Sequence, residues 1–81
     1  MNVHKLDARR SQTAAAAWIA ELNLRTAQNI GDAEAVERAA AEHQRLVLAF
    51  KEAHEAYEAH QQRESERHRR KMARAAARAK A

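Results

Sequence analysis

The sequence lacks cysteine and proline, and it contains one glycine and only three aromatic side chains. Without cysteine, the chain has no disulfide, no thiolate zinc site and no cysteine nucleophile. With one glycine and no proline, it has too few turn-forming residues for the many tight connections of a sandwich, a barrel or most α/β folds. These absences predict an all-α fold with very few turns.

Long apolar runs are also missing. No stretch approaches the roughly 18 consecutive apolar residues that span a bilayer, and the first residues lack the charged-then-apolar pattern of a signal peptide. We therefore expect a cytoplasmic protein with no membrane partner. The length of 81 residues leaves room for one module only.

The strongest helix break lies in the Asn-Ile-Gly-Asp sequence at residues 29–32. Gly31 has no Cβ and therefore suits the left-handed conformation that ends a helix. Asp32 suits the position that begins the next helix, because its carboxylate accepts hydrogen bonds from the exposed amides there. The predicted elements are a first helix over about 7–29 (from Val3 at the earliest), a turn over 30–32 and a second helix from 33. They form a helical hairpin over 1–62, followed by a basic Ala/Arg-rich helical arm over 63–81, for which a frayed end is the alternative.

The first predicted helix carries two apolar stripes at helical spacing. One consists of Trp18, Ile19, Leu22, Thr26 and Ile30, and the other of Ala17, Ala20, Leu24 and Ala27. A helix that is apolar on two sides needs two neighbours. We expect Trp18 to anchor the hairpin core beside Ile19 and Leu22, with exposure as a partner's anchor as the alternative. Leu24 is then left to contact a partner.

The second predicted helix has a seam of residues at alternating spacings of four and three, as in a coiled coil. Its members are Ala39, His43, Leu46, Phe50, Ala53, Tyr57 and His60. His43 is expected to be a partly buried packing or interface residue, and Leu48 lies roughly opposite the seam, which suggests another neighbour. Folded back at Gly31, the first helix covers the second only to about residue 55–60 by helical rise. Tyr57 lies where this coverage stops, so it is the candidate exposed anchor.

The apolar content is dominated by alanine, which contributes little buried area. Hydrophobic residues make up 46% of the chain, and 22 residues are alanine. A lone hairpin of this composition is marginal, because the free energy of burial in a small scaffold roughly cancels the entropy of ordering it. We therefore predict an antiparallel two-helix hairpin that dimerises into a four-helix bundle, as a homodimer, unless another protein covers the same surface.

Charge is unevenly distributed along the sequence. The net charge is +2 over residues 1–31, −5 over 32–66 and +7 over 67–81. Four of the basic residues share one helical face at 4-3-4 spacing, with a fifth adjacent: Arg67, Lys71, Arg74 and Arg78, with Arg70. This basic arm is a candidate for binding nucleic-acid phosphates or an acidic protein surface, and the alternative is a solvated end that confers solubility.

Catalytic and metal-binding patterns are absent from the sequence. No two of the five histidines have the i,i+3 or i,i+4 spacing of a helical zinc pair, and there is no phosphate-binding loop or nucleophile motif. We expect no enzyme activity, no metal and no cofactor. In composition alone, the chain resembles small accessory proteins of bacteria and phages that cover another protein's surface.

The leading functional hypothesis is therefore a non-enzymatic protein–protein interaction module, such as an adaptor, an inhibitor or an assembly factor. It rests on the two-sided apolar helices and on the lack of catalytic groups. The alternative is a nucleic-acid-binding dimer that uses residues 67–81, since each Lys or Arg contact with a phosphate releases counterions and favours binding.

Overall fold

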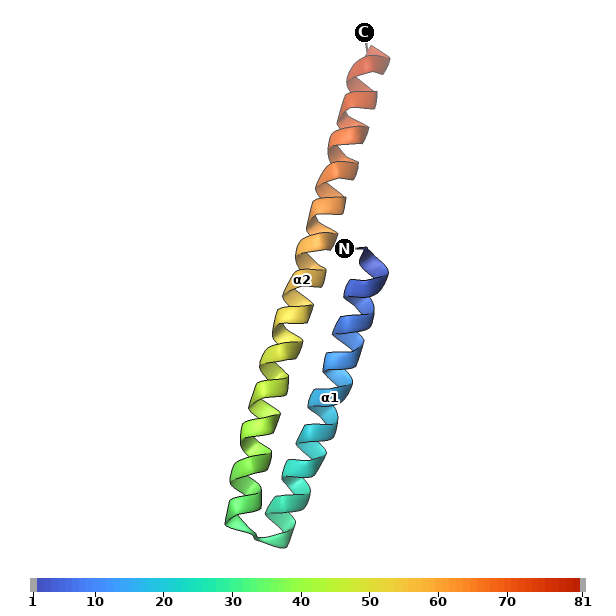
Figure 1. Ribbon diagram of the computed structural model, residues 1–81. Coiled ribbons are helices and arrows are strands. Elements are labelled where there is room, and N and C mark those ends of the chain that lie inside the picture. Colours follow the sequence, from blue (N-terminus) through green and yellow to red (C-terminus); the bar gives the residue numbers. More distant parts are fainter. Residues whose placement is uncertain (1, 81) are drawn as a thin grey trace.

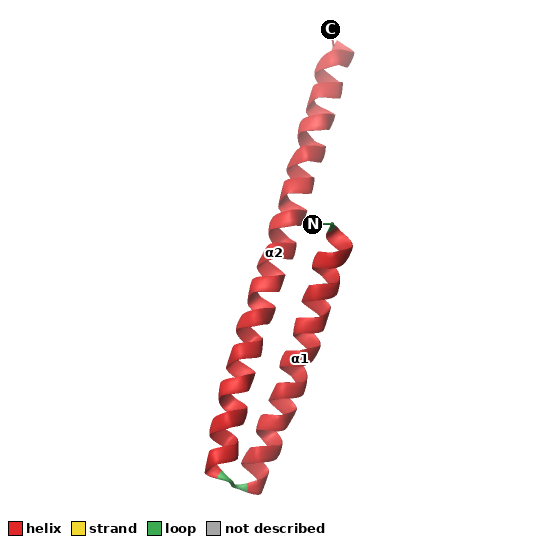
Figure 2. Cartoon of the chain, in the orientation of Figure 1, coloured by secondary structure: helices red, strands yellow, loops and turns green. Residues whose placement is uncertain are grey.

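One turn divides the chain into two helices (Figure 1, Figure 2). In the computed structural model, which describes residues 2–80, α1 covers Val3–Ile30 and α2 covers Ala33–Lys80. No strand occurs within residues 2–80. The expected all-α, two-helix hairpin is therefore confirmed.

The turn has the chemistry that its residues predict. Gly31 adopts the left-handed conformation, with φ 81° and ψ 20°, and its N–H donates to the carbonyl oxygen of Ala27 at 3.0 Å. Asp32 Oδ1 accepts hydrogen bonds from the backbone N–H groups of Glu34 at 3.1 Å and Ala35 at 3.3 Å. Glu34 adds negative charge at the positive end of the α2 dipole. These contacts fix the point at which the chain reverses.

The first helix starts earlier than residue 7. Its N-cap is Asn2, whose side-chain oxygen accepts a hydrogen bond from the backbone N–H of Lys5 at 2.9 Å. Asn is among the preferred N-cap residues, because its side chain replaces a missing helical acceptor. Asn2 was the signal in the sequence that marked this boundary, and α1 accordingly begins at Val3.

α1 contacts α2 through a set of residues at alternating spacings of three and four, which we call the inner stripe. It consists of Val3, Leu6, Arg10, Thr13, Ala17, Ala20, Leu24 and Ala27, all buried or half-buried. The most buried members are Leu6, Ala20 and Ala27. The face of α1 that packs against α2 therefore consists mainly of small or polar side chains.

The residues of α2 that face α1 are larger. All seven members of its expected seam, from Ala39 to His60, are buried or half-buried. Ala53 is the most buried residue of the hairpin at 1% exposed, and Phe50 and Leu46 flank it on the same face. Phe50 also stacks on His54 of the next turn, with ring centroids 5.7 Å apart. Large residues on α2 thus fill the space that alanines leave on α1.

The apolar stripe of α1 that contains Trp18 is exposed, which corrects the expectation that Trp18 anchors the hairpin core. We call this set the outer stripe: Trp18, Ile19, Leu22, Thr26 and Ile30. Trp18 is 56% exposed, Ile19 57% and Leu22 42%, so none of them belongs to the hairpin core. The inner stripe runs the whole length of α1, whereas the large residues of the outer stripe are confined to its second half. Because the inner stripe offers the longer continuous contact, it is the face of α1 that α2 covers.

The two helices differ in length, and α2 extends beyond α1. α1 has 28 residues and α2 has 48, and the molecule measures 73 × 16 × 16 Å. Figure 1 shows the start of α1 beside the middle of α2, with the rest of α2 continuing alone. Residues 61–80 are helical and exposed throughout. Neither of the described helices has the apolar length needed to cross a bilayer.

Gly31→Val is expected to lower the free energy of unfolding by about 1–2 kcal/mol, since a β-branched side chain disfavours the left-handed conformation. A Cβ at this position meets no atom within 4 Å, so the cost comes from the backbone alone. Urea unfolding followed by circular dichroism measures it. Gly31→Asn is the control and loses less, because Asn tolerates this conformation. Equal stability of Gly31→Val and the parent would contradict the turn.

Phe50→Ala is expected to destabilise the hairpin by about 2 kcal/mol, because it removes the largest wholly apolar side chain of the seam. Leu48→Ala is the matched control: Leu48 is 53% exposed, so its loss changes stability by less than about 0.5 kcal/mol. Thermal unfolding of both variants checks the register of α2. A larger effect at Leu48 than at Phe50 would show that the seam is misplaced.

Candidate interaction surfaces

The outer stripe of α1 is the main exposed apolar surface of the hairpin. Beyond Trp18, Ile19 and Leu22, it includes Ile30, which is 74% exposed. The Thr26 hydroxyl donates to the carbonyl oxygen of Leu22 at 3.0 Å, so its hydrogen-bonding need is met within the helix. Exposed apolar side chains at consecutive helical positions are typical of surfaces that contact another protein.

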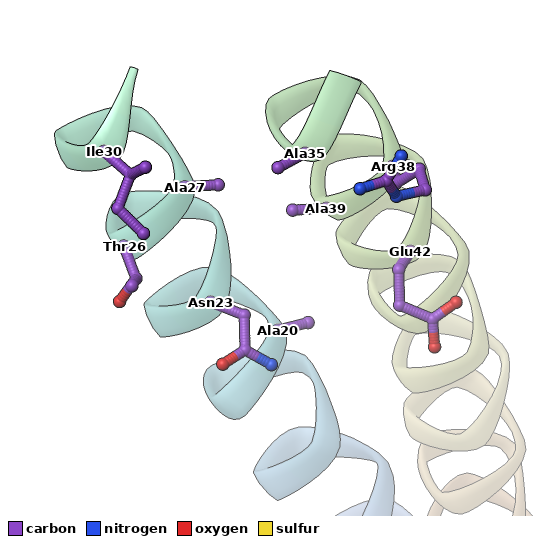
Figure 3. Close-up of a pocket in the computed structure, with 9 residues that line it drawn as sticks. All are labelled: Ala20, Asn23, Thr26, Ala27, Ile30, Ala35, Arg38, Ala39 and Glu42. Atoms are coloured by element: carbon purple, nitrogen blue, oxygen red, sulfur yellow. The ribbon is translucent and has the colours of Figure 1, made fainter. Parts of the chain in front are cut away.

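A shallow groove lies between the helices near the turn (Figure 3). Its volume is about 400 Å³, and facing alanines leave it open: Ala20 and Ala27 on α1, and Ala35 and Ala39 on α2. Arg38 and Glu42 form the polar wall on α2. Arg45 donates hydrogen bonds to the Glu42 carboxylate, which lowers the pKa of that group. Asn23, Thr26 and Ile30 of α1 complete the lining.

The two leucines proposed as partner contacts have different positions. Leu24 is half-buried and belongs to the inner stripe, so it packs against α2 and is not free for a partner. This corrects the expectation that Leu24 lies off the main contact. Leu48 is exposed on α2, as its position opposite the seam predicted.

Tyr57 is less available than the sequence suggested. The guanidinium carbon of Arg10 lies 4.0 Å from the centre of the Tyr57 ring, and the Tyr57 hydroxyl accepts from Gln61 Nε2 at 2.9 Å. Arg10 in turn contacts Asp7 Oδ1 through Nη2 at 2.7 Å. Tyr57 is therefore a half-buried end of the helix contact, covered by a cation–π interaction, rather than an exposed anchor.

His43 is half-buried within the α2 seam, where the sequence placed it. Arg10 and Thr13 are two half-buried residues of the helix contact that the predicted stripes did not include. Thr13 lies in the helix contact with its hydroxyl donating to the carbonyl oxygens of Arg9 and Arg10, at 2.8 Å and 3.0 Å. Their 3-4 spacing with Leu6 and Ala17 was the available signal.

The basic arm presents its charges on an exposed helix. The five residues named from the sequence are all exposed: Arg67, Arg70, Lys71, Arg74 and Arg78. Arg67 Nη1 lies 3.3 Å from Glu64 Oε1, and no acidic residue follows Glu66. Arg63, Arg67, Arg70 and Arg74 line a shallow groove of about 350 Å³ along the helix, together with Glu66. From residue 67 onward, this positive surface has no acidic neighbour in sequence.

Residues 2–80 bring no three His, Cys, Asp or Glu side chains together in an arrangement that would hold a metal ion. Comparisons with protein-family models, curated protein sequences and solved structures found no match to the chain. The surfaces themselves are therefore the basis for a functional proposal.

Arg10→Ala is expected to lower the free energy of unfolding by about 1 kcal/mol, since it removes the cation–π contact with Tyr57 and the ion pair with Asp7. Arg9→Ala is the matched control, because Arg9 is exposed and its backbone carbonyl still accepts from Thr13. Urea unfolding compares the two variants. Equal effects at the two positions would contradict the packing of α1 on Tyr57.

Proposed function

We propose that this protein is a non-enzymatic protein–protein interaction module of the adaptor, inhibitor or assembly-factor type, built on an antiparallel helical hairpin. The observation that carries the proposal is the exposed outer stripe of α1. Tryptophan is among the residue types most enriched at the energetic centres of interfaces. Ile19 and Leu22 lie beside Trp18 on the same exposed face. Burying apolar side chains of this kind against a protein partner is favourable in free energy, because it removes them from water.

The occupant of the outer stripe is a second copy of the chain. The hairpin's own core is thin: Leu6, Ala20, Ala27 and Ala53 are its buried hydrophobic residues, and three of these are alanine. A hairpin with so little buried area gains most of its missing stability by association. A homodimer that joins two hairpins into a four-helix assembly supplies this area.

The position of the outer stripe fits a two-fold contact. Trp18, Ile19 and Leu22 lie near the middle of α1, so a two-fold axis close to them brings each α1 against the other. When the two α1 helices run in opposite directions, Trp18 of one copy meets Leu22 of the other. A self-complementary patch of this kind closes into a dimer, because the same surface of each copy is used up in the contact.

A second candidate function is nucleic-acid binding by a dimer that presents two basic arms. The observation in its favour is that residues 61–80 form an exposed helix and that residues 67–80 contain no acid. Lys and Arg on such a helix are available to phosphates without any rearrangement of the hairpin.

Sedimentation equilibrium over a wide range of concentrations tests the homodimer. The parent is expected to have twice the chain mass, with a melting temperature that rises with concentration. Trp18 is the only tryptophan, so its fluorescence is expected to shift to shorter wavelength as the dimer forms. A parent that stays a folded monomer at micromolar concentration would overturn the self-association.

Leu22→Lys is the disruptive variant, because it places a charge in the centre of the proposed contact. It is expected to shift the sedimentation equilibrium to the monomer or, where the monomer is marginal, to lower the melting temperature. Leu48→Lys is the matched control, since Leu48 is similarly exposed but lies on α2. Equal effects of the two variants on the monomer–dimer equilibrium would contradict the outer stripe as the interface.

A further inference from the structure

The face of α2 that packs against α1 continues into the basic arm with the same spacing. The last seam residue is His60, and steps of four, three, four, three and four lead from it to Glu64, Arg67, Lys71, Arg74 and Arg78. The N-terminal start of α1 lies beside the middle of α2, where this series begins, and all five residues are exposed. One helical face is therefore apolar where α1 covers it and basic where α1 does not.

The basic face is wider than the seam itself. At about 100° per residue, Arg63 and Arg70 lie beside Arg67 and Arg74, and they share a groove with them. Of the eight Lys and Arg residues between 63 and 80, six lie on this face, and Arg69 and Lys80 lie on the opposite one. The charge is thus concentrated on one side of the arm.

This face is unsuited to a protein helix. It contains no large apolar side chain, and Met72, the only one in the arm, lies off it. Protein interfaces depend on an apolar, desolvated centre, which this face cannot provide. A second copy of the arm is excluded as well, because five or six cations of each copy would face one another.

We infer that the basic face binds the phosphates of double-stranded DNA without sequence preference, which refines the nucleic-acid function proposed above and depends on it. A polyanion needs no apolar contact, since neutralised phosphates release counterions. The arm is a bare helix about 10–12 Å across, and the major groove of B-DNA is about 12 Å wide. From Arg67 to Arg78 the face extends for about 16 Å along the helix.

The composition of the arm selects among nucleic acids. Residues 63–80 contain no Trp, Tyr or Phe to serve as a stacking platform for unpaired bases, and His68, their one imidazole, lies off the basic face at about 100° per residue. They also contain no Asn or Gln, the residues that pair with adenine through two hydrogen bonds. The major groove of duplex RNA is too narrow for a helix. The nucleic acid that fits the arm is therefore duplex DNA, bound through its phosphate backbone.

Fluorescence anisotropy with the full chain tests this inference. The probes are two short DNA duplexes of unrelated sequence, a single strand of equal length, and polyglutamate. The chain is expected to bind both duplexes equally and more tightly than the single strand or polyglutamate. The logarithm of the binding constant is expected to fall steeply and linearly with the logarithm of salt concentration.

Two double variants with the same charge change separate the basic face from net charge. Arg74→Gln with Arg78→Gln is expected to reduce the slope of the salt dependence by about two units, as the loss of two phosphate contacts does. Arg69→Gln with Lys80→Gln, on the opposite side, is expected to leave the slope nearly unchanged. Gln and Arg have similar helix propensity, and circular dichroism confirms that the arm stays helical.

The outcomes distinguish the inference from the function on which it depends. An equal reduction of the salt-dependence slope in both double variants would show that the basic face is not the binding site. Nucleic-acid binding would then be an effect of net charge. Tighter binding to the single strand would overturn the duplex assignment. Retention on polyglutamate without duplex binding would overturn both, and would identify an acidic protein surface as the partner.

Discussion

The structure depends on one packing relation, the contact between the small residues of the α1 inner stripe and the larger residues of the α2 seam. Ala20 and Ala27 are buried in this contact, and Ala53 is the matching small position on α2. Small side chains let the helices approach closely, so Leu46 and Phe50 find room without a large partner on α1. Because the alanines take the inside, the largest apolar residues of α1 are left on the outside. The exposed outer stripe is a consequence of how the hairpin closes.

The second constraint is the difference in length between the helices. α1 has 28 residues and α2 has 48, and the spacing that organises the α2 seam does not stop where α1 stops. Up to His60, α1 covers the residues at this spacing. From Arg67 onward, the residues at this spacing are cationic, and burying them beneath another helix would be costly. The same change of residue type that ends the hairpin contact therefore begins the charged surface, and the pair between Glu64 and Arg67 lies at the boundary.

Local signals made most of the fold predictable from the sequence. Gly31 and Asp32 define the turn by their own conformational and hydrogen-bonding preferences, and the 4-3 spacing defines the α2 seam. The orientation of α1 was not predictable by the same means, because it carries two apolar stripes and the more hydrophobic one faces outward. Arg10 is a charged residue at an inner position. Its guanidinium group lies over the Tyr57 ring and pairs with Asp7, and the first of these contacts joins residues far apart in the sequence.

The two proposed surfaces constrain each other through the direction of the arms. If two outer stripes met with the α1 helices parallel, both arms would leave the dimer at the same end, and their basic faces would repel one another. With the α1 helices antiparallel, the arms leave at opposite ends, separated by the length of α1, about 42 Å. Only the second arrangement lets a homodimer present two basic faces without mutual repulsion. Such a dimer would bind one duplex at two separated places or join two duplexes, and in either case the outer stripe sets the distance between the basic faces.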